Sequence, residues 1–176
     1  MNPAWVLRTG RLVMRPVSYL DLADLVALKG NPLVYAVMLG GVRSLGECVA
    51  DLAEDISFWG ELGVGMWAVR EVGGEGFVGY VGLHRRPDGR GVALRFAVAV
   101  SGQGRGYASE AAGAALRFAH ERAGLKRVVA VARETNIASR QVLGAIGMVE
   151  CETYLRDGYR VVVYESVRGT GRLETS

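Results

Sequence analysis

The sequence contains only two cysteines, Cys48 and Cys151, and they lie far apart. They form no Cys-x-x-Cys pair and no metal-binding motif with His84 or His120, so we expect two reduced thiols and no metal. The chain has no apolar run of about 18 residues, and its first residues lack the apolar core of a signal peptide. These absences argue against a disulfide framework and a membrane span, and they predict a soluble, cytoplasmic protein.

Charge is not concentrated in any one segment. The net charge is only +3, and the arginines form no basic run, so direct nucleic-acid binding is not predicted. A small anionic cofactor fits this balance. With 50% hydrophobic and 22% charged residues, the composition is that of a globular protein. A length of 176 residues suits a single domain, which we place at residues 1–168, followed by a flexible tail at 169–176.

Hydrophobic periodicity and turn signals predict a mixed α/β fold. Ser18 and Asp21 mark one helix start, and Ser44 with Glu47 forms a capping box at another. We expect strands at residues 11–17, 66–71, 77–83, 92–100, 128–132, 149–155 and 160–167, and helices after residue 18 and at 44–61, 107–123 and 136–146. Most of the strands then form one mainly antiparallel sheet, with helices on both of its faces.

A glycine-rich segment joins the strand that ends near residue 100 to the helix that begins near Tyr107. Residues 103–108 read Gln-Gly-Arg-Gly-Tyr-Ala. The start of a helix presents unpaired backbone N–H groups and the positive end of the helix dipole, and glycine lets a phosphate approach the backbone closely. The segment therefore predicts a ligand that carries phosphate.

Three phosphate-binding patterns compete for this segment. A Walker loop requires a lysine, and none follows Gly106. A dinucleotide fingerprint requires a further glycine at the position that Ser109 occupies, and the preceding strands are in the wrong order for it. The pattern Gln/Arg-x-x-Gly-x-Gly/Ala is satisfied in full, although six residues alone are a weak signal.

Several further segments give this pattern a context. They occur in order across about residues 8–167, namely Thr-Gly-Arg-Leu-Val-Met-Arg-Pro at 9–16, Met-Trp-Ala-Val-Arg at 66–70, Gly-Tyr-Val-Gly-Leu at 79–83, Gly-Arg-Gly-Tyr-Ala-Ser-Glu-Ala at 104–111, Asn-Ile-Ala-Ser-Arg at 136–140 and Gly-Met at 147–148. In these segments the chain resembles the GNAT superfamily of N-acetyltransferases, and specifically its RimJ/RimL-like branch.

This resemblance implies the GNAT acyl-CoA N-acyltransferase fold, acetyl-CoA as the co-substrate and no metal. It places the pyrophosphate on the residues of the glycine-rich segment, which are Gln103, Gly104, Arg105, Gly106, Tyr107 and Ala108. It places the pantetheine amides on the strand edge formed by Phe96, Ala97 and Val98, and a second coenzyme contact on Asn136, Ser139 and Arg140. The physical requirements agree, because a diphosphate needs several N–H donors and an amide-bearing arm needs an unpaired strand edge.

The catalytic residues are less clear, because the chain departs from the family pattern. Where the family has Glu-Leu-Gly-Tyr, residues 93–96 read Ala-Leu-Arg-Phe, so the carboxylate expected to deprotonate the amine is absent. Glu150 and Glu152 are the nearest alternatives in sequence, unless they are ordinary solvated carboxylates. Leu143 occupies the place of the tyrosine that serves many members as general acid. The RimJ/RimL-like branch instead has a serine, matched by Ser139, which either protonates the leaving sulfur or only binds the coenzyme.

The resemblance thus implies an N-acetyltransferase that moves acetyl directly, in a ternary complex, to a protein N-terminus or a small-molecule amine. A binding module that holds acyl-CoA without turnover is the alternative, and an unrelated phosphate-binding α/β protein is a third. We expect residues 35–43 and 85–90 to rim the acceptor groove. Four arginines there either favour an acidic acceptor or form a solvated rim, namely Arg43, Arg85, Arg86 and Arg90. The exposed edge of the final hairpin leaves the choice between monomer and homodimer open.

Overall fold

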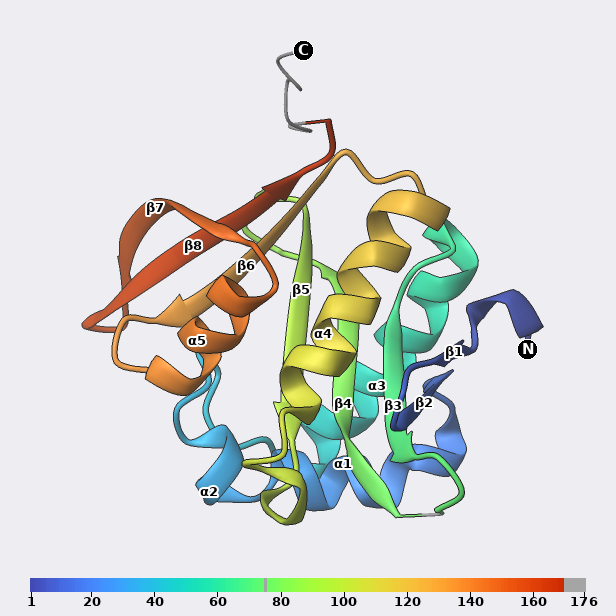
Figure 1. Cartoon of the computed structure of the whole chain (residues 1–176). Helices are drawn as coiled ribbons and strands as arrows, with labels where there is room; N and C mark the ends of the chain where they lie inside the picture. The colour runs from blue at the N-terminus through green and yellow to red at the C-terminus, as the bar shows by residue number, and fades with distance from the viewer. Residues whose placement is uncertain (75, 170–176) are drawn as a thin grey trace.

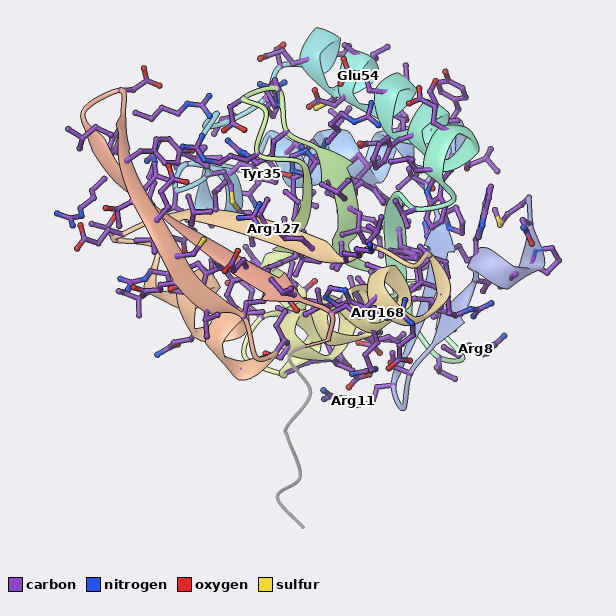
Figure 2. All side chains as sticks on the ribbon, turned by 90° about the horizontal axis from the view of Figure 1, so that it is seen from above. Arg8, Arg11, Tyr35, Glu54, Arg127 and Arg168 are labelled. Carbon is purple, nitrogen blue, oxygen red and sulfur yellow. The ribbon has the colours of Figure 1, made fainter. Side chains whose placement is uncertain are left out.

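The computed structural model describes residues 1–74 and 76–169, and it shows one sheet between two layers of helices (Figure 1). The strands are β1 (Leu7–Arg8), β2 (Leu12–Pro16), β3 (Met66–Glu71), β4 (Phe77–Arg85), β5 (Val92–Val98), β6 (Arg127–Arg133), β7 (Val149–Arg156) and β8 (Tyr159–Val167). The helices are α1 (Leu22–Lys29), α2 (Pro32–Tyr35), α3 (Leu45–Leu62), α4 (Tyr107–Arg117) and α5 (Ile137–Ala145). Figure 2 shows α3 on one side of the sheet and α4 and α5 on the other.

The sheet has eight strands in the order β1-β2-β3-β4-β5-β6-β8-β7, and every neighbouring pair is antiparallel except β5 and β6. The predicted mixed α/β fold with a mostly antiparallel sheet is therefore confirmed. The parallel pair has a single register partner, Ala93 with Val129. Beyond that pair the two strands diverge toward their carboxyl ends (Figure 1). The glycine-rich segment and the start of α5 both follow strands that end at this opening.

Local signals set the helix boundaries. Ser44 with Glu47 forms the predicted capping box, and Ser18 with Asp21, predicted as a helix start, forms a second one; in each, either side chain accepts from the partner's backbone N–H. The first box begins a short 3₁₀ turn that leads into α1. Gly63 then ends α3 in the left-handed conformation, with a φ of 68°. The predicted starts of both helices are confirmed.

Other predicted boundaries were wrong in specific ways. The strand expected to reach residue 100 ends at Val98, because a 3₁₀ turn occupies Val100–Gly102. The helix expected to reach residue 123 is α-helical only to Arg117, and it continues as a π-helical turn at Phe118–Arg122. The short elements β1 and α2 were not predicted, since two and four residues carry too little periodicity. Most of the predicted tail, 170–176, lies outside the described residues.

The α4 helix packs closely on the sheet because its inner face consists of small residues. Four alanines on that face are at most 1% exposed, namely Ala111, Ala112, Ala115 and Ala119. Next to them, the Trp59 ring lies 4.9 Å from both the Trp5 and the Trp67 ring, and the Phe118 ring lies 5.3 Å from Trp67. The alanine face thus holds α4 against the sheet, and the aromatic cluster packs at the opposite end from its start, around Phe118.

Candidate functional site

The glycine-rich segment forms a turn of exposed N–H groups at the start of α4. In the described part of the chain, none of the backbone N–H groups of residues 104–109 donates to a protein acceptor. Gly104 and Gly106 both have a φ of 77°, a conformation that favours glycine. The side chain of Gln103 donates to the carbonyl oxygen of Val98 at 3.1 Å and so ties the turn to the end of β5. Six consecutive unpaired donors at a helix start form an anion-binding geometry.

Glu110 holds this turn in place from the first turn of α4. Its carboxylate accepts from the Thr9 hydroxyl, from the backbone N–H of Arg11 at 3.1 Å and from the Arg11 guanidinium at 2.8 Å. Arg11 also donates to the carbonyl oxygen of Arg105 at 2.7 Å. Burial alone would raise the pKa of Glu110, but these hydrogen bonds outweigh it and hold the pKa below its ordinary value. The turn between β1 and β2, at residues 9–11, therefore braces the anion-binding turn.

Arg105 lies beside the turn with its side chain about half exposed. Its guanidinium forms an ion pair with Glu71 at 3.0 Å, and the Tyr107 hydroxyl donates to the same carboxylate at 3.1 Å. An exposed ion pair of this kind contributes little stability. Arg105 can therefore leave Glu71 at small cost and turn toward a bound anion.

The second predicted coenzyme segment lies at the start of α5, beside α4 (Figure 1). The Asn136 side chain accepts from the backbone N–H of Ser139 at 3.2 Å and caps the helix. The Ser139 side chain is partly buried, and its hydroxyl has no partner among the described residues. Arg140 is already bound elsewhere, because it donates to the Tyr164 hydroxyl at 3.0 Å and to Glu150 at 2.8 Å. Among the described residues, the Ser139 hydroxyl and the side-chain amide nitrogen of Asn136 have no hydrogen-bond partner, so these two groups are available to a ligand.

The predicted pantetheine edge lies between these two segments. Phe96, Ala97 and Val98 pair on one side with β4, where their partners are Val81, Tyr80 and Gly79. On their other side β6 has already diverged, since only Ala93 pairs with it. The structure therefore brings together an open strand edge, the anion-binding turn and Ser139 at one end of the sheet.

The two carboxylates predicted as alternative bases lie on β7, on either side of a register shift. Glu150 accepts from Arg140 at 2.8 Å and from the Tyr164 hydroxyl at 3.2 Å, and Glu152 accepts from Arg90 at 2.7 Å. The hydrogen bond from Arg140 lowers the pKa of Glu150, and that from Arg90 lowers the pKa of Glu152. A lowered pKa makes a carboxylate a weaker proton acceptor, so this geometry gives both residues a structural partner and does not favour them as bases.

A buried polar cluster that the sequence analysis missed lies on the opposite face of the sheet. Asp55 of α3 accepts from the Tyr80 hydroxyl and, at 3.2 Å, from the Arg95 guanidinium, which also donates to that hydroxyl at 2.8 Å. Burial raises the pKa of Asp55 despite the charge of Arg95. Asp55 and Arg95 line a cavity of about 430 Å³ together with His84. One signal in the sequence could have revealed this cluster. Charged residues stand at positions that otherwise carry apolar residues, Asp55 in a predicted helix and Arg95 in a predicted strand.

His84, in the lining of this cavity, makes the stability of the folded protein depend on pH. Burial, with the charges of Arg95 and Arg86, lowers its pKa to about 2. Because the unfolded pKa is near 6.5, the folded state gains stability above that value and loses it as the pH falls below it. We expect the free energy of unfolding to fall by about 2 kcal/mol between pH 7 and pH 5, and His84→Gln to remove most of that fall. Urea titrations at both pH values measure this, and an equal fall in the variant would contradict it.

The arginines expected around the acceptor groove are all paired with carboxylates. Arg43 binds Asp51 at 3.0 Å, and Arg90 binds Glu152 at 2.7 Å. The remaining two pairs are Arg85 with Glu61 at 3.8 Å and Arg86 with Asp88 at 2.7 Å. These pairs neutralise the charge of the four arginines, which argues against selection of acidic acceptors, although Arg86 is itself buried and only the other three can belong to a solvated rim.

Within residues 1–74 and 76–169, no helix is both long and apolar enough to cross a membrane. The same residues contain no group of three histidine, cysteine, aspartate or glutamate side chains placed to hold a metal ion. Cys48 is buried and Cys151 is exposed, and neither forms a disulfide.

Comparison with known proteins gives this geometry a context. A family model described as an acetyltransferase (GNAT) domain matches residues 11–149. Among solved structures, an acetyltransferase from Agrobacterium tumefaciens str. C58 is similar, with 27% identity, a TM-score of 0.80 and coverage of 92% of this chain and 93% of that one. A search among curated proteins found no matching sequence.

Two more distant structures share the fold. One is a RimL ribosomal L7/L12 alpha-N-protein acetyltransferase in complex with coenzyme A, with 18% identity, a TM-score of 0.73 and coverage of 92% of this chain and 97% of that one. The other is a ribosomal-protein-S5-alanine acetyltransferase from Vibrio fischeri, with 15% identity, a TM-score of 0.75 and coverage of 94% and 97%. At these identities the likeness concerns the fold alone.

Proposed function

Because the chain belongs to the GNAT acetyltransferase family, we propose that it is an acetyl-CoA-dependent N-acetyltransferase that transfers acetyl directly to a primary amine in a ternary complex. The observation that carries the proposal is the run of unpaired N–H groups at residues 104–109, at the end of the sheet where β5 and β6 diverge. The acceptor is a protein N-terminus or a small-molecule amine.

The residues present fit a coenzyme A molecule in three respects. The N–H groups of 104–109 and the guanidinium of Arg105 would bind the diphosphate. The open edge of β5 at residues 96–98 would bind the pantetheine amides by strand addition. Asn136 caps the first turn of α5 by accepting from the backbone N–H of Ser139, and the Ser139 hydroxyl would be the second coenzyme contact. Arg140 contributes indirectly, since it ties α5 to β8 through Tyr164.

Ser139 is the residue we assign to the leaving thiolate. Its hydroxyl either donates a proton to the sulfur or only hydrogen-bonds to the coenzyme. Replacement of Ser139 by alanine separates these roles. A general acid predicts a fall in kcat with little change in the Kd for coenzyme A, whereas a binding role predicts the reverse. Stopped-flow turnover and calorimetry on the same preparation measure both quantities.

Deprotonation of the amine requires no strong base if the acceptor has a pKa near 8, as protein N-termini do. We therefore expect kcat/KM to rise with pH until the acceptor amine itself is neutral, and the midpoint to shift when an acceptor of different pKa is used. Glu150→Gln and Glu152→Gln should each change the value of kcat/KM at high pH by less than about threefold. A hundredfold lower value in either variant would show that the replaced carboxylate is the general base.

The direct test of the function is release of free thiol from acetyl-CoA in the presence of peptide and small-amine panels, with product masses. Turnover with a mass gain of one acetyl group on an amine supports the proposal. A second candidate, an acyl-CoA-binding module, is favoured by the alanine at position 93 and by the ion pairs of Glu150 and Glu152. Tight coenzyme binding without turnover for any acceptor would favour that module.

A further inference from the structure

Three arginines without a carboxylate partner surround one cavity. Most arginines of the described residues form ion pairs, but Arg8, Arg117 and Arg122 are exposed and form neither an ion pair nor a side-chain hydrogen bond within residues 1–74 and 76–169. Arg122 only lies over the Phe118 ring, 5.2 Å from its centroid. All three line a cavity of about 460 Å³ between β1, with the turn after it, and one side of α4. Unpaired guanidinium groups around one cavity indicate a negatively charged ligand.

This cavity is separate from the proposed coenzyme site. The α4 helix lies between α5 and β1 (Figure 1). The coenzyme segments lie toward α5, where β5 and β6 diverge, whereas the cavity lies toward β1. Figure 2 shows Arg8 on the α4 side of the sheet. None of the residues to which we assign a direct coenzyme contact lines the cavity.

The charge of the cavity favours an anion that carries about two charges. Five charged side chains line it, and these are the three arginines with Glu110 and Glu121. Glu110 is already bound by Thr9 and Arg11, whereas Glu121 forms no ion pair with a described residue. The three arginines therefore exceed the one unpaired carboxylate by two charges. A phosphate monoester carries about −1.5 to −2 charges at pH 7, whereas a single carboxylate carries one.

The size and the buried lining of the cavity favour a phosphate that is attached to an organic group. Its apolar lining consists of Leu7, Ala114 and Phe118, and the last two are 8% and 5% exposed. A volume of about 460 Å³ lies in the usual range for small-molecule pockets. Guanidinium groups bind phosphate oxygens through two parallel N–H donors. The arginines would therefore hold the phosphate while the organic group packs on Phe118.

The cavity shares part of its wall with the brace of the anion-binding turn. Thr9, Gly10 and Glu110 line the cavity. The same segment holds the turn at 104–109, because Arg11 bonds to both Glu110 and the carbonyl oxygen of Arg105. A phosphate in the cavity and a diphosphate on the turn would thus lie near the same brace. Like charges at such distances repel each other, above all at low salt.

We propose that this cavity binds a phosphate monoester of a small organic molecule through Arg8, Arg117 and Arg122, and that the bound ligand weakens coenzyme A binding. The site itself is independent of the proposed function, whereas its effect on the coenzyme rests on that function. Because coupling between two sites is reciprocal, coenzyme A weakens the binding of the ligand by the same factor.

Three probes test the class of ligand. Phenyl phosphate has the phosphate and an apolar ring, inorganic phosphate lacks the ring, and benzoate has the ring with a single charge. Each is titrated calorimetrically into protein saturated with coenzyme A, which occupies the turn, and into Gly104→Asp without coenzyme. We expect a Kd of about 1 mM or lower for phenyl phosphate, and at least roughly threefold weaker binding of the other two. Equal binding of benzoate or of inorganic phosphate would overturn the ligand class, and no binding of any probe would overturn the site.

Variants locate the site. Arg8→Gln and Arg117→Gln each remove a charge without breaking an ion pair, and we expect each to raise the Kd of phenyl phosphate roughly fivefold or more. Glu121→Gln should instead lower this Kd roughly threefold, because it removes the opposing charge. The control is Arg15→Gln, which removes another exposed, unpaired arginine on the far face of β2, since Met14 beside it packs toward α4. Unchanged binding in both arginine variants, or an equal loss in the control, would overturn the site.

The effect on the coenzyme is measured separately. We expect saturating phenyl phosphate at low salt to raise the Kd of coenzyme A about two- to tenfold, and to have little effect in Arg117→Gln. An unchanged Kd in the unmodified protein would overturn the coupling. A rise that persists in Arg117→Gln would also overturn it, because the probe would then compete at the turn. If coenzyme A does not bind at all, the proposed function fails, and the titrations of Gly104→Asp with the arginine variants added still decide whether the site exists.

Discussion

Replacement of Gly104 by aspartate should weaken coenzyme A binding by at least roughly thirtyfold, whereas asparagine at the same position should weaken it only a few-fold. A diphosphate carries about two negative charges, and each repels a carboxylate about 4 Å away by about 1 kcal/mol even in bulk water. The two variants have nearly the same shape. Asparagine and aspartate also tolerate the positive φ of 77° at Gly104 better than other non-glycine residues do, and a Cβ there would meet no atom within 4 Å.

Calorimetric titration with coenzyme A measures both affinities, and thermal unfolding checks that the two variants are equally stable. Because the asparagine variant controls for backbone strain, the difference between the variants reports the charge alone. Similar Kd values in Gly104→Asp and Gly104→Asn, both close to that of the unchanged protein, would place the phosphates away from residues 104–109. A large and equal loss in both would mean that the turn needs glycine for its conformation.

The parts of this site that the sequence predicted are those encoded within a few neighbouring residues. The turn at 103–108 and the helix start at residue 136 each depend on a short pattern, so the sequence predicts both. The partners of Glu150 and Glu152 were not, because Arg140 and Arg90 approach from α5 and from the turn before β5. Spacing along the chain does not show which arginine reaches which carboxylate.

The buried cluster of Asp55, Tyr80 and Arg95 was not predicted either, because its members are still farther apart in the sequence. Asp55, Tyr80 and Arg95 come from α3, β4 and β5, and they meet only once the sheet has its register. On α3, Leu52 and Trp59 face the core, whereas Val49, which stands at helical spacing from them, is 42% exposed. The divergence of β5 and β6 depends on the pairing of whole strands, so no short pattern predicts it.

Replacement of Asp55 by alanine should lower the free energy of unfolding by about 3–5 kcal/mol, because it leaves the charge of Arg95 and the hydroxyl of Tyr80 in the interior without their acceptor. The partly exposed ion pair between Asp24 and Arg70, at 3.1 Å, provides the control, because Arg70 keeps a second carboxylate partner in Asp21 when Asp24 is removed. Asp24→Ala should cost no more than about 1 kcal/mol. Urea unfolding followed by circular dichroism measures both changes, and similar values for the two variants would contradict the buried character of the cluster.

A double-mutant cycle shows whether the loss of stability comes from the interaction of Asp55 with Arg95 or from the replacement of Asp55 within α3 alone. If Asp55 and Arg95 stabilise each other, Asp55→Asn/Arg95→Gln should be less destabilised than the sum of the two single variants, by an interaction energy of about 1–3 kcal/mol. Removing both charges also removes the penalty of leaving either one alone, which is the larger part of what the single variants lose. If the effects of the two single variants simply add up in the double variant, Asp55 stabilises only its own helix, and contacts other than Asp55 hold Arg95 in place.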